Sequence, residues 1–458
     1  MKKAISIAVI VIMVLTLGVT ASGCKGTSSS DDNKSNFGDV IPGGSADVST
    51  EVLEALQNSG EISMYILDNG STVKGNDSEW FREFLEYYKQ VYNGTVDVRN
   101  MVTDSWENKF LVEFASGDNP DLIHLFEINF PKYASRGMVY SVEEMKEMGV
   151  VGFDHPQLTK DLDLVSDYFK YKGEHYTFCT NMAEADMLFV NEDLFKRYSV
   201  KSPSEYYKEG IWNWENFEKC ASEITRDTDG DGKNDIYGYY GWDGNYIITA
   251  AGGELVHLNE DGKLSVGLDD SATVRGLENY ANIYGRLKCA TTYDTVSFRK
   301  GELAMRAFLP QNEYAIQCGE GGEKYNFEWS MVPFPLDEET NVNRIRSGKS
   351  YAWTVASSAK NPQGCINFMI ALRTYKDMNP NPYDYDYTKC FTDEQIQMIE
   401  DCTRQVVVPI YQGVGSLWTN QWDFWGMVQR GSAPSEIVAA YKPMFEAQVA
   451  IENGSATK

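Results

Sequence analysis

One acidic run of the sequence has the residue types and spacing of a metal site. The candidate ligands are Asp227, Asp229, Asp231, Lys233 and Asp235. They take places 1, 3, 5, 7 and 9 of a calcium loop, in which carboxylates and one backbone carbonyl, here that of Lys233, supply the oxygen atoms that a hard cation needs. Place 12 is Gly238, so the bidentate Glu of an EF-hand is missing. We expect a structural Ca2+ site completed by a carboxylate from elsewhere in the chain. The alternative is a solvated Asx-turn loop.

Tryptophans outside periodic segments are candidate ligand contacts. Trp242 lies among turn residues in the run GWDGN, and Trp418, Trp422 and Trp425 fall within eight residues beside amides and an acid. Flat aromatic rings pack against the apolar C–H faces of a sugar, while amides and carboxylates pair with its hydroxyls. These tryptophans could therefore form a sugar site. The alternative for each is packing in the core.

Polar residues that follow predicted strands form a second set of candidates. They are Asp68, Asn69, Glu127, Gln311 and Asn312. The first three follow apolar strands at 62–67 and 122–126, and the last two follow a strand around Ala304-Met305 and a proline. Because ligands of α/β sheets bind at the carboxyl ends of strands, these side chains could contact a ligand.

The elements that must position these residues alternate between strand and helix. Strands are predicted at 62–67, 95–99 and 122–126, where short apolar runs end in turn residues. The two helices between them begin at Ser78 and Ser105, and each carries aromatic residues on one face. This alternation implies right-handed crossovers and a largely parallel sheet, and hence an α/β fold.

The first 50 residues indicate export and attachment to a membrane. Residues 1–23 have the lysines, apolar run and small residues of a signal peptide. Residues 21–24 read ASGC and end at Cys24. This sequence resembles the lipobox of bacterial lipoproteins, in which the cysteine is lipidated. An ordinary signal peptide is the alternative. Residues 24–50 are rich in Ser, Asp, Asn and Gly, so we expect a lipidated cysteine and a flexible tether. The mature chain would then be anchored by Cys24 to the outer face of the bacterial cell membrane.

Composition excludes several classes of protein. The 458 residues include 41 Lys and Arg against 67 Asp and Glu, a net charge of −26, with no basic block, so we expect no nucleic-acid partner. An aromatic content of 13% argues against a disordered chain. Four histidines leave little room for a transition-metal site.

Seven cysteines besides Cys24 cannot all pair within one chain, because their number is odd. Their spacing does not match a metal site. Cys390 and Cys402, twelve residues apart, could form a disulfide. Most of the others are expected to be small buried side chains.

Several segments, in order, resemble the family 1 extracellular solute-binding proteins of bacteria. They are ASGDNPDL at 115–122, YKGEHY at 171–176, MLFVNEDLF at 187–195, WENF at 214–217, FRKGELAM at 298–305, and the strand 351–355 with the helix 363–372. The resemblance spans nearly the whole mature chain. It implies a two-lobed periplasmic-binding-protein-like fold of type II, with a ligand cleft between the lobes. The boundaries it implies are 51–178 and 304–346 for lobe one, and 179–303 and 347–458 for lobe two.

The resemblance also bears on the candidate site. It adds Asn181, which follows the first crossing between lobes, and Trp353, on a strand whose family counterpart approaches the cleft. The cluster of Trp418, Trp422 and Trp425 is similar in placement to the C-terminal platform of sugar binders in this family.

The implied function is that of a non-catalytic binding lipoprotein. It would capture a carbohydrate, in particular an oligosaccharide, by hinge closure, and the membrane permease of an ABC importer would recognise the closed form. We expect no catalysis and a monomer. One alternative is a secreted carbohydrate-active hydrolase, although the sequence has no G-x-S-x-G, H-E-x-x-H or Walker motif. The others are a binding protein for a peptide or another non-sugar solute, and a calcium-dependent adhesion component.

Overall fold

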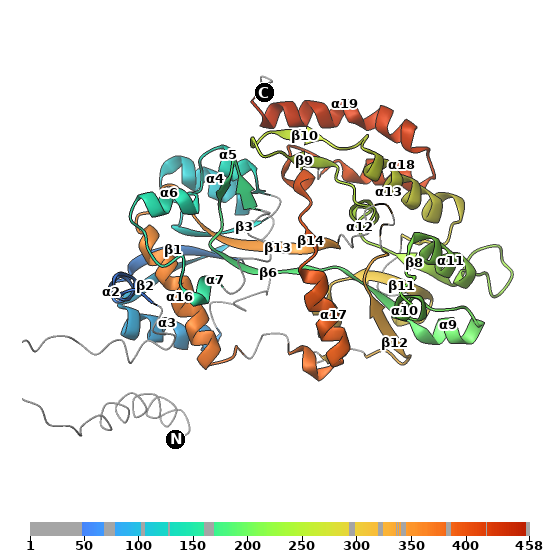
Figure 1. Ribbon diagram of the computed structural model, residues 1–458, viewed down its shortest axis with the longest axis horizontal. Helices are drawn as coiled ribbons and strands as arrows, with labels where there is room; N and C mark the ends of the chain where they lie inside the picture. Colours follow the sequence, from blue (N-terminus) through green and yellow to red (C-terminus); the bar gives the residue numbers. More distant parts are fainter. Residues whose placement is uncertain are drawn as a thin grey trace, which may run out of the picture.

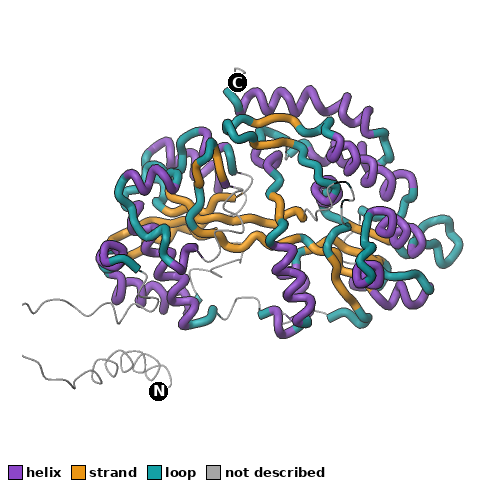
Figure 2. Tube along the Cα trace, viewed as in Figure 1, coloured by secondary structure: helices purple, strands orange, loops and turns teal. Residues whose placement is uncertain are grey.

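The computed structural model contains two α/β lobes joined by strands that cross between them (Figure 1). It describes residues 48–67, 78–101, 106–126, 129–159, 169–292, 298–318, 324–335, 337, 339, 345–381, 386–417 and 419–454. The predicted signal peptide, Cys24 and nearly all of the predicted tether lie outside these ranges. Within them, no helix combines the length and the apolar character that a membrane span requires. Figure 2 shows the strands in the interior of each half, with helices around them.

Lobe one is built on a sheet with the strand order β14-β13-β3-β1-β2, in which β6 also pairs with β13. Its strands are β1 (Gly60–Leu67), β2 (Gly94–Met101), β3 (Leu122–Phe126), β6 (Cys179–Ala185), β13 (Ile345–Val355) and β14 (Val406–Val407). β1 is parallel to both β2 and β3, whereas β13 is antiparallel to β3 and β6. The predicted parallel arrangement of the first three strands is therefore confirmed.

The helices of lobe one cover both faces of this sheet. They are α2 (Thr50–Leu56), α3 (Glu79–Tyr92), α4 (Trp106–Ser116), α5 (Lys132–Ser135), α6 (Val142–Glu147), α7 (Pro156–Thr159) and α16 (Pro362–Met378). A small hairpin of β4 (Lys170–Tyr171) and β5 (Glu174–His175) completes the lobe. The predicted start of the first long helix is confirmed, because Ser78 Oγ accepts a hydrogen bond from the Phe81 N–H at 3.1 Å and caps α3.

The core of lobe one depends on the aromatic face of α3. Phe84 and Tyr88 are fully buried and meet Phe368 of α16 edge to face, with ring centroids 5.3 Å and 5.4 Å apart. Burial of each such side chain contributes about 1.5–3 kcal/mol of stability. At the end of α3, a Cβ on Gly94 would lie 2.3 Å from the Tyr88 ring, so this tight turn into β2 requires glycine.

Lobe two is built on a smaller sheet with the order β12-β7-β11-β8. Its strands are β7 (Met187–Asn191), β8 (Tyr237–Tyr240), β11 (Leu303–Phe308) and β12 (Trp329–Val332). A separate hairpin consists of β9 (Val256–Leu258) and β10 (Leu264–Val266). β11 is parallel to β8 and antiparallel to β7, so this sheet is mixed.

Two groups of helices surround the sheet of lobe two. The first group is α9 (Glu192–Tyr198), α10 (Pro203–Lys208), α11 (Trp214–Ile224), α12 (Asn245–Ala250), α13 (Ser271–Ala281), a π-helical turn (Asn282–Arg286) and α15 (Pro310–Cys318). The second group comes from the end of the chain: a 3-10 turn (Tyr387–Lys389), α17 (Asp393–Thr403), a second 3-10 turn (Ile410–Gly413), α18 (Gln421–Gln429) and α19 (Pro434–Glu452).

The hinge consists of the antiparallel strands β6 and β13. Cys179, at the start of β6, pairs with Trp353 beside lobe one, and Ala185, at its end, pairs with Ser347. β7 of lobe two begins at Met187, two residues after β6 ends. The chain crosses once more between α16 and the 3-10 turn at Tyr387–Lys389.

The predicted assignment of the two C-terminal segments, residues 304–346 and 347–458, to the lobes is wrong. Residues 304–346 were expected in lobe one, but they include β11, which pairs with β7 and β8 of lobe two. Residues 347–458 were expected in lobe two, but they include most of β13 and all of α16, which belong to the sheet and core of lobe one. Each segment is an apolar element whose partners in the sheet lie far away in the chain, so local sequence does not show its lobe.

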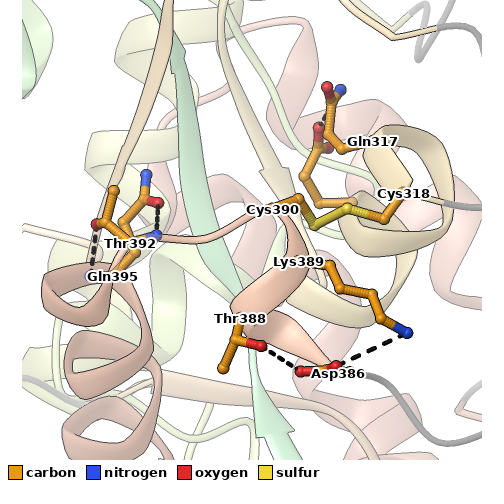
Figure 3. Close-up of a disulfide and its surroundings, with 9 residues drawn as sticks. Gln317, Cys318, Asp386, Thr388, Lys389, Cys390, Thr392 and Gln395 are labelled. Carbon is orange, nitrogen blue, oxygen red and sulfur yellow. Dashed lines mark hydrogen bonds and ion pairs between the residues drawn. A yellow bond between two sulfur atoms is a disulfide. The ribbon is translucent and has the colours of Figure 1, made fainter.

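A disulfide joins Cys318, the last residue of α15, to Cys390, which follows the 3-10 turn at Tyr387–Lys389 (Figure 3). Cys402 is buried and unpaired, so the predicted pairing of Cys390 with Cys402 is wrong. Cys220, Cys289 and Cys365 are also buried and free, as expected for small core side chains. The bond links α15 to the segment that leads into α17, and a disulfide suits an oxidising environment outside the cell.

Candidate functional site

Strand registers show which edge of lobe two faces the hinge. β8 and β11 are parallel neighbours, and Tyr240 pairs with Arg306 near their carboxyl ends. Phe308, the last residue of β11, pairs with Met187, the first residue of β7. Because β7 follows the hinge strand β6 almost directly, the carboxyl ends of β8 and β11 lie on the hinge side of lobe two.

The equivalent edge of lobe one also faces the hinge. β13 enters this lobe from the hinge, and its Tyr351 pairs with Phe126, the last residue of β3. Val355, at the far end of β13, pairs with Leu122, the first residue of β3. The carboxyl ends of β3 and of its parallel neighbour β1 therefore lie on the hinge side. The two edges that carry ligands in α/β folds thus face each other, which locates the predicted cleft.

Two exposed tryptophans stand at this edge of lobe two. Trp242 follows the carboxyl end of β8, and Trp422 lies in the first turn of α18, with exposed fractions of 47% and 55%. Their ring centroids are 5.9 Å apart, and the ring planes meet at 81°. We call Trp242 and Trp422 the tryptophan platform. It leaves broad aromatic faces accessible, which is what stacking against a sugar requires.

A buried polar network holds the platform from behind. Asp243 and Gln421 are the chain neighbours of the two tryptophans, and both lie beside the Tyr411 hydroxyl, with 3.3 Å to Asp243 Oδ2 and 3.2 Å to Gln421 Oε1. Trp425 Nε1 donates a hydrogen bond to the same Gln421 oxygen at 3.2 Å. All four side chains are buried. One network therefore fixes the backbone beside both platform residues, although they are 180 residues apart in the chain.

Trp425 also shapes the loop that carries Trp242. A Cβ on Gly244 would lie 2.4 Å from Trp425 Cε3, so the loop needs glycine to pass this ring. On its other side Trp425 meets Tyr280 at a centroid distance of 5.6 Å. Burial raises the pKa of the Tyr280 hydroxyl above its ordinary value, so this group stays protonated and neutral. α12, which follows the loop, lies against β13, close to the hinge (Figure 1).

Gln311 and Asn312 occupy the same edge, because α15 begins where β11 ends. Asn312 is exposed and Gln311 is half-buried. Their predicted position after a strand of the site is confirmed, while their contact with a ligand stays a prediction.

A buried ion pair that sequence analysis missed supports this turn. Arg306 of β11 and Glu313 of α15 are fully buried, with 2.5 Å between Nη2 and Oε2. The Tyr325 hydroxyl accepts a hydrogen bond from Arg306 Nη2 at 2.8 Å. Burial raises the pKa of the Glu313 carboxyl, and the positive charge of Arg306 opposes this shift. Local spacing gives no sign of the pair, because Arg306 lies in a strand and Glu313 in the following helix, and charged side chains are usually solvated.

Two of the predicted tryptophans lie in the core. Trp353 is 2% exposed and belongs to the apolar cluster of lobe one, together with residues of α3 and α16, so its side chain lies on the face of the sheet that these two helices cover. Trp425 is equally buried and supports the platform from behind. Neither ring offers an exposed face in this structure, and contact of Trp353 or Trp425 with a ligand stays a prediction.

The remaining candidates cannot be compared with the geometry of the site. Asp68, Asn69, Glu127 and Trp418 lie outside the described residues. The backbone of Asn181 belongs to the hinge strand β6 and pairs with Tyr351, but its side chain is not among the described parts. The ligand contacts proposed for these five residues stay predictions.

The two lobes also touch away from the hinge. Arg136, after α5, lies 3.2 Å from Glu452, the last residue of α19. The turn of the β9–β10 hairpin meets the β4–β5 hairpin, where a Cβ on Gly262 would lie 2.5 Å from Cγ of Lys172. Figure 1 shows β10 and α19 at the top of lobe two, with the hinge strands below them. The predicted cleft would therefore lie between the hinge and these rim contacts.

The acidic loop lies at the other end of lobe two, beyond α11. Three of its carboxylates have oxygen atoms within 4.8 Å of one another, those of Asp227, Asp229 and Asp235. Asp227 accepts hydrogen bonds from the N–H of Gly232 at 2.7 Å and of Gly230 at 2.6 Å, and these bonds lower the pKa of its carboxyl. Asp231 instead accepts from the Lys233 N–H at 2.8 Å. The donor set is all carboxylate, which fits a hard cation such as Ca2+.

A hollow in lobe two is separate from the platform. A groove of about 830 Å³ lies between α9, α10, β12 and α17, and its floor contains Glu192, Ser204 and Ser330. Glu192 Oε1 accepts hydrogen bonds from both serine hydroxyls, at 2.6 Å and 2.5 Å. Its polar groups thus pair with each other, and the groove shares no residue with the platform.

Comparison with solved structures supports the two-lobed arrangement. An ABC substrate-binding protein from Listeria monocytogenes in complex with cycloalternan is 18% identical, over 87% of this chain and 100% of that chain, with a TM-score of 0.59. An extracellular solute-binding protein from Staphylococcus aureus in complex with maltose is 12% identical, over 85% and 98%, with a TM-score of 0.63. UgpB from Mycobacterium tuberculosis in complex with glycerophosphocholine is 14% identical, over 86% and 99%, with a TM-score of 0.60. These identities show the fold alone, and the predicted two-lobed fold is confirmed.

Sequence comparison gives the family. No curated protein matches the chain. Residues 83–380 match the family described as bacterial extracellular solute-binding protein, and they make up more than half of the chain. This agrees with the resemblance found in the sequence motifs and with an exported protein. The chain is therefore a member of the bacterial extracellular solute-binding protein family.

Proposed function

We propose that the protein captures a carbohydrate, in particular an oligosaccharide, between its two lobes and delivers it to the permease of an ABC importer. The observation that carries this proposal is the tryptophan platform at the edge of lobe two that faces lobe one. Exposed tryptophan rings suit the apolar C–H faces of sugar rings.

The ligands of similar proteins agree with this proposal. The Listeria monocytogenes protein is in complex with cycloalternan, and the Staphylococcus aureus protein is in complex with maltose. UgpB, in complex with glycerophosphocholine, is a reason to keep a second candidate, a polar non-sugar solute that carries hydroxyls. The two candidates differ in charge and in the number of rings, so a ligand panel can separate them.

In the proposed mechanism each lobe has a distinct task. Trp242 and Trp422 stack against the ligand, while Asp243, Tyr411 and Gln421 keep both rings in place. Gln311 and Asn312 offer amide groups to ligand hydroxyls from the same edge. Closure about β6 and β13 brings lobe one onto the bound ligand, and the permease binds the closed form. The ligand leaves unchanged, so the protein is not an enzyme.

We further propose that Cys24 carries the lipid anchor and that residues 25–50 form the tether. The support is the lipobox-like sequence and the polar composition of the segment. Two acyl chains suffice for stable attachment to a membrane, where one chain is marginal. The chain would act as a monomer on the outer face of the cell membrane, next to its permease.

We propose that Asp227, Asp229 and Asp235 hold Ca2+, with Asp231 and the Lys233 carbonyl as further ligands. The support is the carboxylate cluster and the spacing of the run. A bound cation would neutralise charges that otherwise repel one another in this exposed loop. The ion would act on stability alone, because the loop lies beyond α11 and shares no residue with the platform.

A thermal-shift panel tests the proposed function directly. The mature chain from residue 25 is melted with maltose, maltotetraose, monosaccharides and glycerophosphocholine. A ligand present at 100 times its Kd adds about 2.7 kcal/mol of stability, which appears as a raised melting temperature. We expect the largest shift with an oligosaccharide and no product after long incubation. A shift with glycerophosphocholine alone would support the second candidate, and hydrolysis of a sugar would contradict a binding role.

Substitution of the two neighbouring tryptophans separates binding from packing. Trp422→Ala removes an exposed ring, so we expect an unchanged melting temperature and an affinity lower by about tenfold or more, equal to about 1.4 kcal/mol. Trp425→Ala leaves a cavity in the core, and removal of a buried tryptophan costs about 3–5 kcal/mol, so its melting temperature should fall clearly. Titration calorimetry gives both affinities. Full affinity in Trp422→Ala would remove the platform from the site.

Chelation tests the calcium site without any sugar. EDTA should lower the melting temperature of the wild-type protein, and added Ca2+ should restore it, since an ion that binds only the folded state stabilises it. Asp229→Asn should melt at one temperature with or without EDTA. Identical melting of the wild-type protein in EDTA and in Ca2+ would contradict the proposal.

Substitution of Cys24 tests the anchor in cells. The wild-type chain should incorporate labelled palmitate and sediment with membranes. Cys24→Ala should incorporate no label, because the thiol that would carry the acyl chain is gone. Labelled palmitate in the Cys24→Ala chain, or a wild-type chain released into the medium, would contradict the proposal.

A further inference from the structure

Asn129 is a buried amide with no partner. Its side chain is 0% exposed, and neither Nδ2 nor Oδ1 makes a hydrogen bond. Buried polar groups in folded proteins nearly always find a partner, because leaving a donor or an acceptor unpaired costs more than a made bond contributes. Asn129 leaves both kinds of group unpaired, so it needs an explanation.

Other buried asparagines of the described residues do not share this property. Asn191 Oδ1 accepts a hydrogen bond from the Leu194 N–H at 3.2 Å, and Asn367 Nδ2 donates to the Ala55 carbonyl at 2.7 Å. Asn245 Nδ2 donates to Thr249 Oγ1 at 3.2 Å. The fold therefore provides partners for these three amides; Gln412 leaves one group unpaired, Nε2, whereas Asn129 leaves both.

The position of Asn129 explains the difference. It is the third residue after the carboxyl end of β3, and this end lies on the hinge side of lobe one, opposite the ends of β8 and β11. Its neighbour Phe130 packs against Phe169 and Tyr176 of lobe one, with ring centroids 5.5 Å and 6.2 Å apart, and so anchors the residues that follow β3. Asn129 thus follows the hinge-side end of β3, at the edge of the sheet where α/β folds bind ligands.

We propose that Asn129 is a ligand-binding residue of lobe one, whose amide pairs with neighbouring hydroxyls of the captured solute. Oδ1 accepts a hydrogen bond from one ligand O–H, and Nδ2 donates to a second ligand oxygen. This proposal rests on the proposed function and deepens it, since it names the contact that lobe one makes.

The pairing also indicates the chemical class of the ligand. An anion accepts hydrogen bonds only and would leave Oδ1 unpaired, while a cation donates only and would leave Nδ2 unpaired. A hydroxyl both donates and accepts, so two adjacent hydroxyls satisfy the whole amide. Asn129 therefore selects a neutral, polyhydroxylated part of the solute, as found on any sugar ring.

Asn129→Leu provides the test, because it keeps the size of the side chain and removes both polar groups. If the amide waits for a ligand, the ligand-free variant loses an unpaired buried group and should melt at the same temperature as the wild type or higher. Its affinity for maltotetraose should fall roughly thirtyfold, as expected from the loss of two hydrogen bonds. If Asn129 were purely structural, the ligand-free variant should melt at a lower temperature and keep its affinity for maltotetraose.

Asn367→Leu is the matched control, since it removes a buried amide of the same lobe that does have a partner. It should melt at a lower temperature than the wild type and keep its affinity for maltotetraose. A fall in the melting temperature of ligand-free Asn129→Leu as large as that of Asn367→Leu would overturn the proposal, and so would unchanged affinity.

The two measurements also separate this proposal from the proposed function. If the wild-type protein binds none of the sugars in the panel, the proposed function fails. Even in that case, the melting temperatures of ligand-free Asn129→Leu and Asn367→Leu can be compared, and they show whether the amide of Asn129 has a structural partner. A raised or equal melting temperature of Asn129→Leu supports a binding role, and a lowered one contradicts it.

Discussion

The whole arrangement depends on how β13 pairs. This one strand is antiparallel to β3 in the sheet of lobe one and antiparallel to β6 in the hinge, and its N-terminal residues also pair with β14. Because its register with β3 joins Tyr351 to Phe126, the carboxyl end of β3 must lie on the hinge side. β6 then leads directly into β7, whose register with β11 turns the carboxyl ends of lobe two toward the same side. Shared backbone pairing, rather than direct contact between side chains, makes the two ligand edges face each other.

The platform needs a rigid support, because each tryptophan stands in a different part of the chain. Trp242 is held by its neighbour Asp243 and Trp422 by its neighbour Gln421, and both neighbours meet at the Tyr411 hydroxyl. Such a buried network is stable only when its members are paired, and here a side chain from α18, Trp425, completes it. The rings can therefore remain exposed without becoming loose, so less conformational entropy is lost when a ligand stacks on them.

The sequence predicted the local helices and strands and the family correctly, but it did not predict which distant segments pair. The strands and helices up to Phe126 follow from local signals such as the Ser78 cap and the aromatic face of α3, and these predictions hold. The lobe of β11 or of α16 depends on partners far away in the chain, which local patterns cannot show. The same limit applies to the site. Trp353 and Trp422 look alike in sequence, but one lies under the helices of lobe one and the other in water. Asn129 gave no signal at all, because an unpaired buried amide is visible only once every neighbour is known.

The division of contacts between the lobes has a thermodynamic consequence for the proposed function. A ligand shifts the balance between open and closed forms only through contacts that differ between them. Stacking on the platform involves lobe two alone and is available in both forms, so it sets the affinity of the open protein. The rim pair of Arg136 and Glu452 joins the two lobes, but a partly exposed ion pair contributes only about 0–1 kcal/mol. Closure must therefore be driven by the groups of lobe one that the ligand reaches last. An amide that stays unpaired until the ligand arrives, such as Asn129, is well suited to this role, because its hydrogen bonds are gained only in the liganded, closed protein.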